Sequence, residues 1–162
     1  MDFLAAQSDT FFLGQAVEYK GTSMTNTLKD VPRDKLLEMP LGISNGLAVA
    51  GTVPISIYPR WNFLLLTMNQ LINHLDRMPN FSHGEYIPKV IVRTGIGSVR
   101  PLHPQAQHVG DFTDGLRLMT NNIEIIRLEE PEEIFPAYEH AYTRTDGKST
   151  LIVEYGDYYG EK

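Results

Sequence analysis

The residue best placed for chemistry in this sequence is a histidine in a polar stretch of chain. His108 follows Gln107 and lies three residues before Asp111, between an expected strand and an expected helix. A histidine in such a loop can donate a hydrogen bond to a developing anion or transfer a proton near neutral pH. A structural histidine is the alternative, and the spacing by itself favours that plainer interpretation.

The next candidate is the aromatic-rich segment 58–63, which reads Tyr-Pro-Arg-Trp-Asn-Phe. It lies between an expected strand and an expected helix, and aromatic side chains at such an edge can stack on a flat heterocyclic ligand. An aromatic cluster of the core or of a subunit interface is the alternative. The segment taken on its own favours that alternative.

Other patterns that could carry chemistry are incomplete. Gly95-Ile96-Gly97 follows an expected strand, but the third glycine of a dinucleotide fingerprint is missing, so a plain turn is the better interpretation. His103 and His108 are five residues apart and no cluster of carboxylates completes a ligand set, so we expect no metal site in this chain alone. The motifs of serine hydrolases, P-loop proteins and zinc proteases are also missing.

Composition narrows the class of protein. The 162 residues are 42% hydrophobic and 21% charged, which predicts one compact globular domain over residues 1–162. The net charge of -6 argues against binding to nucleic acid. We expect no membrane association, because the sequence has no long apolar run and its start lacks the pattern of a signal peptide. The sequence has no cysteine, which excludes disulfides and thiolate chemistry and fits a cytoplasmic location.

Apolar patterns predict the elements that must position these residues. Continuous apolar runs predict strands over residues 10–14, 53–58, 89–94, 123–128 and 150–155. Periodicity and start signals predict helices over 42–51, 61–78, 111–120 and 131–142. This alternation predicts an α/β fold, a doubly wound and mainly parallel sheet with helices on both faces. Such sheets bind ligands at the carboxyl ends of their strands, so a site is expected in the loops after Tyr58, Thr94 and Leu128.

Read in order, the segments resemble the pyrimidine-binding domain of transketolase-type enzymes, and in particular the beta subunits of 2-oxo acid dehydrogenases such as pyruvate dehydrogenase. The resemblance covers nearly the whole chain and rests on the number and order of its motifs. The family's "TFNF" and "DQ.IN" resemble YPRWNF at 58–63 and NQLIN at 69–73, its "IVFR" and "AQHS" resemble IVR at 91–93 and AQH at 106–108, and its "LGEDV" and "GAAxxGLKP" resemble FLGQAV at 12–17 and GLAVAGTVP at 46–54.

The resemblance implies thiamine diphosphate as the cofactor, and it implies roles for several residues. Phe63 matches the aromatic residue that packs on the aminopyrimidine ring, and we expect Trp61 and Gln107 to take part in cofactor binding as well. His108 matches an active-site histidine that stabilises charge or moves a proton on the acyl intermediate. Arg93 matches a structural arginine beneath the active-site loop. The substrate implied is a 2-oxo acid or a ketose.

The family's activating glutamate, which hydrogen-bonds a ring nitrogen of the cofactor, has no clear counterpart. It is expected between Pro40 and the helix that starts near Gly42, where several family residues are missing. Glu38 is the nearest carboxylate and is our candidate for the catalytic acid, although it aligns with an acidic residue upstream of the catalytic one. Either the loop is deleted, or the sequence omits a loop that has little to order it without cofactor and partner. Gln15 likewise stands where the family has an acid.

The sequence also lacks the Gly-Asp-Gly signature with which the family binds magnesium and the diphosphate. We therefore expect a partner subunit that carries the diphosphate-binding domain and most of the Mg²⁺ coordination. The cofactor then lies at the interface of a homodimer or hetero-oligomer. The function expected is that of a pyrimidine-domain subunit of a split thiamine diphosphate enzyme. The alternatives are a non-catalytic, degenerate domain that serves oligomerisation or regulation and, on the glycine turn alone, a nucleotide-binding module.

Overall fold

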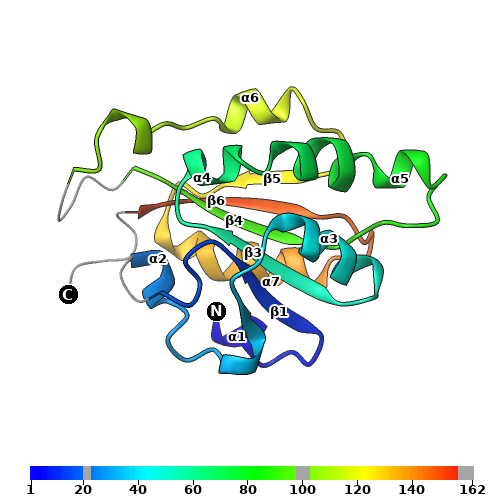
Figure 1. Cartoon of the computed structure of the whole chain (residues 1–162), viewed down its shortest axis with the longest axis horizontal. Coiled ribbons are helices and arrows are strands. Elements are labelled where there is room, and N and C mark those ends of the chain that lie inside the picture. The colour runs from blue at the N-terminus through cyan, green and yellow to red at the C-terminus, as the bar shows by residue number, and fades with distance from the viewer. Residues whose placement is uncertain (20–22, 98–102, 157–162) are drawn as a thin grey trace.

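The computed structural model describes residues 1–19, 23–97 and 103–156 of the chain. Its centre is a sheet of six parallel strands in the order β2-β1-β3-β4-β6-β5 (Figure 1). The strands are β1 (Thr10–Gly14), β2 (Leu36–Leu37), β3 (Val53–Tyr58), β4 (Ile91–Ile96), β5 (Glu124–Arg127) and β6 (Thr150–Tyr155). The expected parallel α/β sheet is confirmed. Strand β2 was not predicted, because two residues are too few to show a period.

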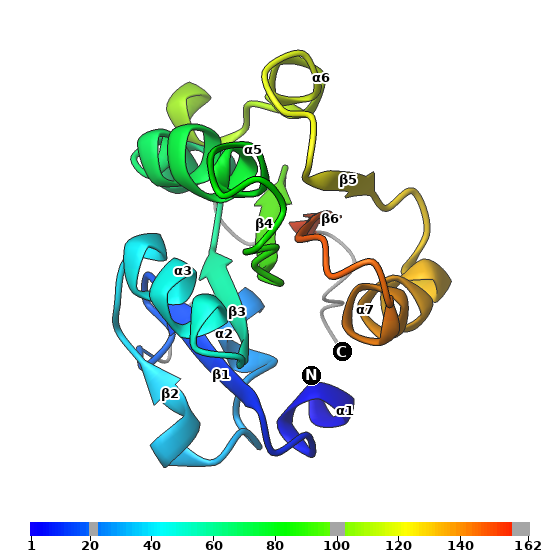
Figure 2. The ribbon, with the colours of Figure 1, turned by 90° about the vertical axis from the view of Figure 1, so that its right-hand side faces the viewer.

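Helices cover both faces of this sheet (Figure 2). One face carries α3 (Leu41–Val49), α4 (Trp61–Leu65), the π-helix η2 (Asn69–Asp76), α5 (Met78–Phe81) and α6 (Thr113–Arg117). The other carries α1 (Asp2–Ala5) and α7 (Ile134–Thr143), which follows the turn η4 (Pro131–Glu133). The connections contain α2 (Ser23–Asn26), η1 (Arg33–Lys35) and η3 (Ala106–His108). Each face packs its own cluster of apolar side chains against the sheet, as a doubly wound fold requires.

The single helix expected over residues 61–78 is divided into three helical segments. The Thr67 hydroxyl donates to the Leu64 carbonyl at 2.8 Å, a side-chain bond that competes with the regular helical pattern. Eight residues of π-helix follow, and Pro79 then lies in the first turn of α5. Proline has no N–H with which to continue the preceding helix. Pro136 is tolerated because it lies in the first turn of α7, where its N–H would have no helical partner.

Between β2 and α3 the chain takes a short route. Glu38, Met39 and Pro40 join the two elements directly, and Pro40 is the N-cap residue of α3. The family's activating glutamate is expected in this connection. Glu38 therefore lies at the carboxyl edge of the sheet, directly after β2 and three residues before α3.

A buried ion pair connects four parts of the fold. Arg93 of β4 donates through Nε and Nη2 to the two carboxylate oxygens of Glu154 of β6, each at 2.9 Å. The two side chains are only 2% and 0% exposed. Arg93 Nη1 also donates to the Thr27 hydroxyl at 2.8 Å, and the Tyr138 hydroxyl of α7 donates to Glu154. Arg93 thus holds a structural position, which is the role that the resemblance implies.

Strands β1 and β3 approach each other so closely at one point that only glycine fits. Gly14 has a φ of +142°, and a Cβ placed on it would lie 1.9 Å from the Ile57 carbonyl oxygen. Real Cβ atoms do not come so close to a backbone oxygen, and side chains disfavour this φ. Gly14 is the last residue of β1, so the close approach lies at the carboxyl edge of the sheet.

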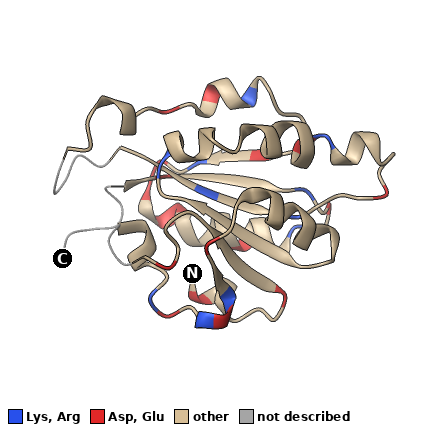
Figure 3. Cartoon of the chain, in the orientation of Figure 1, with Lys and Arg blue, Asp and Glu red and all other residues tan. Residues whose placement is uncertain are grey.

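Lys and Arg residues are interspersed with Asp and Glu residues over the described elements rather than gathered along one of them (Figure 3). Over the ranges that the structure describes, no helix is both long and apolar enough to cross a membrane.

We predict that Glu154→Gln destabilises the protein by about 3–5 kcal/mol, because it removes the carboxylate that pairs with the buried Arg93 guanidinium. Asp114→Asn is the matched control, since it breaks an exposed pair with Arg117 and is expected to cost about 0.5 kcal/mol or less. Urea unfolding measures both values. Equal stabilities of the two variants would contradict the role given to the buried pair.

We predict that Gly14→Ala lowers the free energy of unfolding by about 2 kcal/mol or more, because its methyl group meets the Ile57 carbonyl. Gly46→Ala is expected to raise the free energy of unfolding instead. Gly46 lies within α3 with open space around its Cβ position, so alanine should stabilise the helix by about 0.5–1 kcal/mol. Thermal unfolding of the two variants tests whether their shifts have opposite signs.

Candidate functional site

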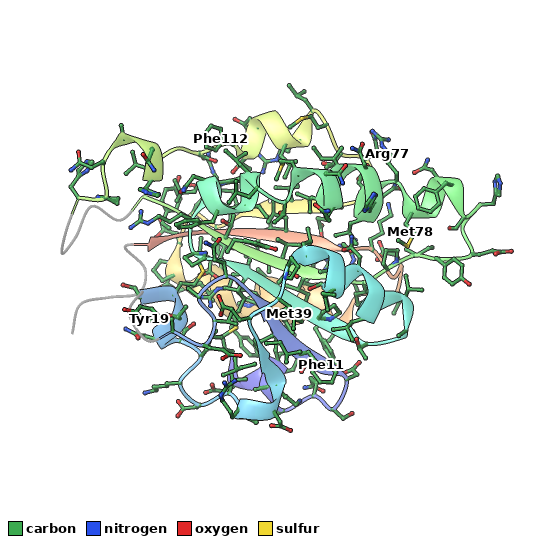
Figure 4. All side chains as sticks on the ribbon, in the orientation of Figure 1. Phe11, Tyr19, Met39, Arg77, Met78 and Phe112 are labelled. Carbon is green, nitrogen blue, oxygen red and sulfur yellow. The ribbon has the colours of Figure 1, made fainter. Side chains whose placement is uncertain are left out.

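A pocket of about 320 Å³ opens at the carboxyl ends of β1, β2 and β3, next to the start of α3. This edge is where open α/β sheets bind ligands, and ligand pockets usually measure roughly 300–1,000 Å³. Two of the residues expected to be functional, Glu38 and Phe63, line it. Met39, beside the start of α3, is labelled in Figure 4. The pocket is lined by Gly14, Gln15, Glu38, Met39, Pro40, Tyr58, Phe63, Leu66 and Thr67.

The backbone that follows β1 holds Glu38 in place. The carboxylate accepts a hydrogen bond from the Ala16 amide and, at 3.3 Å, one from the Glu18 amide. Ala16 has a φ of +60°, a left-handed conformation that is uncommon outside glycine and is typical of tight turns. The acid is exposed, and its oxygens have lone pairs left for a ligand. A turn of the chain therefore positions a carboxylate at the wall of the pocket.

His108 packs against Phe63. The centroids of the two rings are 5.6 Å apart and the ring planes meet at 35°. Phe63 belongs to α4 and His108 to η3, so this contact joins the connections that follow β3 and β4. Gln107 Nε2 lies 3.2 Å from His108 Nε2, and this amide can favour one tautomer of the imidazole. His108 Nδ1 is buried and has no hydrogen-bond partner within the described ranges.

Trp61 lies outside the pocket. It is 1% exposed and packs edge-to-face on Phe112, with the ring centroids 6.1 Å apart and an interplanar angle of 77°. Figure 4 labels Phe112 on the side of the sheet that α4 and α6 cover. Trp61 thus lies in the core beneath the site, which is the alternative that the aromatic segment left open. Gln107 is exposed beside His108 and does not line the pocket either.

Tyr58, the last residue of β3, belongs to the aromatic segment 58–63 but was given no role of its own from the sequence. Its side chain lines the pocket but is only 3% exposed. Burial raises the pKa of the Tyr58 hydroxyl, while the Leu41 amide and the Thr67 hydroxyl act against that rise. Neither neighbour forms a hydrogen bond of regular geometry with it, and the hydroxyl is unpaired in the described part of the chain. A polar-tipped aromatic at the end of a mostly apolar strand was the signal that could have pointed to its hydroxyl.

The chemistry of the lining residues favours a flat polar ring. The pocket offers the Glu38 carboxylate, the Gln15 amide and the Phe63 ring, whereas the Tyr58 hydroxyl is buried and the Thr67 hydroxyl is bonded to the backbone; none of its nine lining residues is Lys or Arg. Within residues 1–19, 23–97 and 103–156, no group of three or more His, Asp or Glu side chains is arranged to hold a metal ion. This wall of the site therefore has contacts for a ring but no cation for a phosphate.

No protein-family model and no curated protein matches this sequence. Among solved structures, the chain is similar to the X-ray structure of a protein from Mycobacterium smegmatis that is named as a candidate thiamin diphosphate-dependent enzyme, with a TM-score of 0.66 and 14% sequence identity. The match covers 94% of this chain and 29% of that one, so the chain spans less than a third of its length. At this identity, the likeness shows a shared fold.

We expect Tyr58→Phe to leave the free energy of unfolding unchanged or to raise it, because it removes a buried hydroxyl that has no regular partner. Thr113→Val is the comparison. The Thr113 hydroxyl is buried and donates to Asp111 at the start of α6, so its loss is expected to cost about 1 kcal/mol. Urea unfolding decides, and a loss of 1 kcal/mol or more in Tyr58→Phe would show that the hydroxyl is satisfied.

Proposed function

We propose that this chain is the pyrimidine-domain subunit of a split thiamine diphosphate-dependent enzyme that acts on a 2-oxo acid or a ketose. One observation carries the proposal: Glu38 and Phe63 line the same pocket at the carboxyl edge of the sheet, and His108 packs on Phe63. The resemblance to the beta subunits of 2-oxo acid dehydrogenases and the fold shared with a candidate thiamin diphosphate-dependent enzyme support it.

The lining residues fit the aminopyrimidine end of the cofactor. Phe63 supplies an aromatic face for the ring, and Glu38 supplies a carboxylate of fixed position for a ring nitrogen. The absence of Lys and Arg from the lining residues leaves the diphosphate and its Mg²⁺ to another domain. A partner subunit with a diphosphate-binding domain holds that end, and the cofactor lies between subunits of a homodimer or hetero-oligomer.

Thiamine diphosphate, when bound, supplies the nucleophilic carbon that attacks the substrate carbonyl. The residues of this chain orient the ring and handle protons around it. Glu38 holds the proton that it shares with the ring nitrogen, and Phe63 fixes the plane of the ring. His108 donates to the oxygen of the substrate carbonyl as negative charge develops there. Because two backbone amides already hold Glu38, little reorganisation is needed when the ring enters.

Isothermal titration of the full-length chain with thiamine diphosphate and Mg²⁺ tests the proposal, with and without a candidate partner that carries the Gly-Asp-Gly signature. We expect binding in the reconstituted complex. Phe63→Ala should weaken it about threefold to tenfold through loss of ring packing. Glu38→Gln should lower turnover by about 10²–10⁴-fold, because an amide cannot exchange the proton.

Phe135→Ala and Glu132→Gln are the matched controls. Both residues are exposed; Phe135 lies in α7 and Glu132 in η4, on the opposite side of the sheet from the pocket helices. Binding and turnover should stay as in the parent protein. If the reconstituted complex of the parent protein binds no thiamine diphosphate, the proposal is rejected.

One observation favours a second candidate, a non-catalytic domain that serves oligomerisation or regulation. The connection between β2 and α3 is short and runs through Pro40, where the family has a longer loop with its glutamate. In that case Glu38→Gln changes neither cofactor binding nor oligomeric state. The titrations above and size measurements on the same variant separate the two candidates.

A further inference from the structure

Arg60 connects the two segments that meet at the site. Its guanidinium Nη1 donates to the Gly97 carbonyl at 2.5 Å and to the His108 carbonyl at 3.0 Å. Gly97 directly follows β4, and His108 closes η3. Hydrogen bonds from a cation are shorter and stronger than neutral ones, so this double contact restrains the backbone at both positions.

The backbone of Arg60 also starts the helix that carries Phe63. Arg60 is the N-cap residue of α4, and its carbonyl accepts from the Phe63 amide at 3.0 Å and from the Leu64 amide at 3.3 Å. One residue therefore holds the main chain of His108 through its side chain and the main chain of Phe63 through its carbonyl. The rings of His108 and Phe63 then meet at 5.6 Å.

We infer that Arg60 is a positioning residue that sets the imidazole of His108 against Phe63, next to the pocket. The use of this placement in the reaction rests on the proposed function, whereas the placement itself is a property of the free chain. Arg60 is partly buried, and its guanidinium can bridge two carbonyls from one nitrogen. A shorter or apolar side chain cannot make this bridge, so His108 loses its fixed distance from Phe63.

The test is a nuclear Overhauser measurement between the ring protons of His108 and Phe63 in the full-length chain without ligand. We expect the cross-peak in the parent protein and its loss in Arg60→Met. Arg117→Met is the matched control, because Arg117 is a half-exposed arginine of α6 that pairs with Asp114. The cross-peak should persist in that variant. A cross-peak of unchanged intensity in Arg60→Met overturns the inference.

If Arg60→Met does not fold, Arg60→Gln decides by the same cross-peak, since its shorter and neutral side chain cannot reproduce the charged bridge to the two carbonyls. A weaker cross-peak supports the inference, and an unchanged one overturns it. In the reconstituted enzyme, Arg60→Met should lower kcat by about 10²-fold with KM little changed, as displacement of a catalytic group by about 1 Å does. Failure of the parent protein to bind thiamine diphosphate would reject the proposed function and leave the ring contact to be judged by itself.

Discussion

The ion pair between Arg93 and Glu154 constrains the rest of the structure. Charges this deeply buried persist only when they are paired and hydrogen-bonded, so β4, β6 and α7 must keep the register that brings their partners together. In that register Arg93 of β4 lies opposite Ile152 of β6 and Ile57 of β3. The pair therefore favours the register of β4 against β6, and β4 ends three residues after Arg93, at the edge where the connections with Arg60 and His108 lie.

The two faces of the sheet carry different features, the buried ion pair on one and the helices around the pocket on the other. Alternation along β4 and β6 places Arg93 and Glu154 on the face that α1 and α7 cover, while Tyr58 at the end of β3 packs on the face of α3 and α4. The ion pair thus stabilises the sheet on the face of α1 and α7, and the pocket forms at the carboxyl edge beside α3 and α4. At that edge, contacts between backbone and side chain hold the site residues: the Ala16 amide bonds the Glu38 carboxylate, and the Arg60 guanidinium bonds the His108 carbonyl.

Much of the fold followed from the sequence, because continuous apolar strands and periodic helices leave few other arrangements for a chain of this length. The residues that line the pocket could be predicted only in part. Phe63 could be identified through an ordered motif, but the position of Glu38 depends on the φ of Ala16 and on a short connection that no periodicity reveals. Tyr58 lay in the aromatic segment, but its unpaired hydroxyl could not be predicted, because it results from burial in the fold. Local side-chain bonds such as that of Thr67 likewise divide a helix that the apolar spacing shows as continuous.

Trp61 gives the protein an optical property. It is the only tryptophan in the sequence, it is 1% exposed, and it neighbours Arg60 in the chain. Its indole ring packs on Phe112, and its Nε1 has no hydrogen-bond partner in the described part of the chain. Any shift between α4 and the segment that leads into α6 changes the polarity around the indole. Its fluorescence emission therefore reports on the packing of Trp61 against Phe112 without an attached label. A ligand that only fills the pocket does not contact the indole, because Trp61 does not line it.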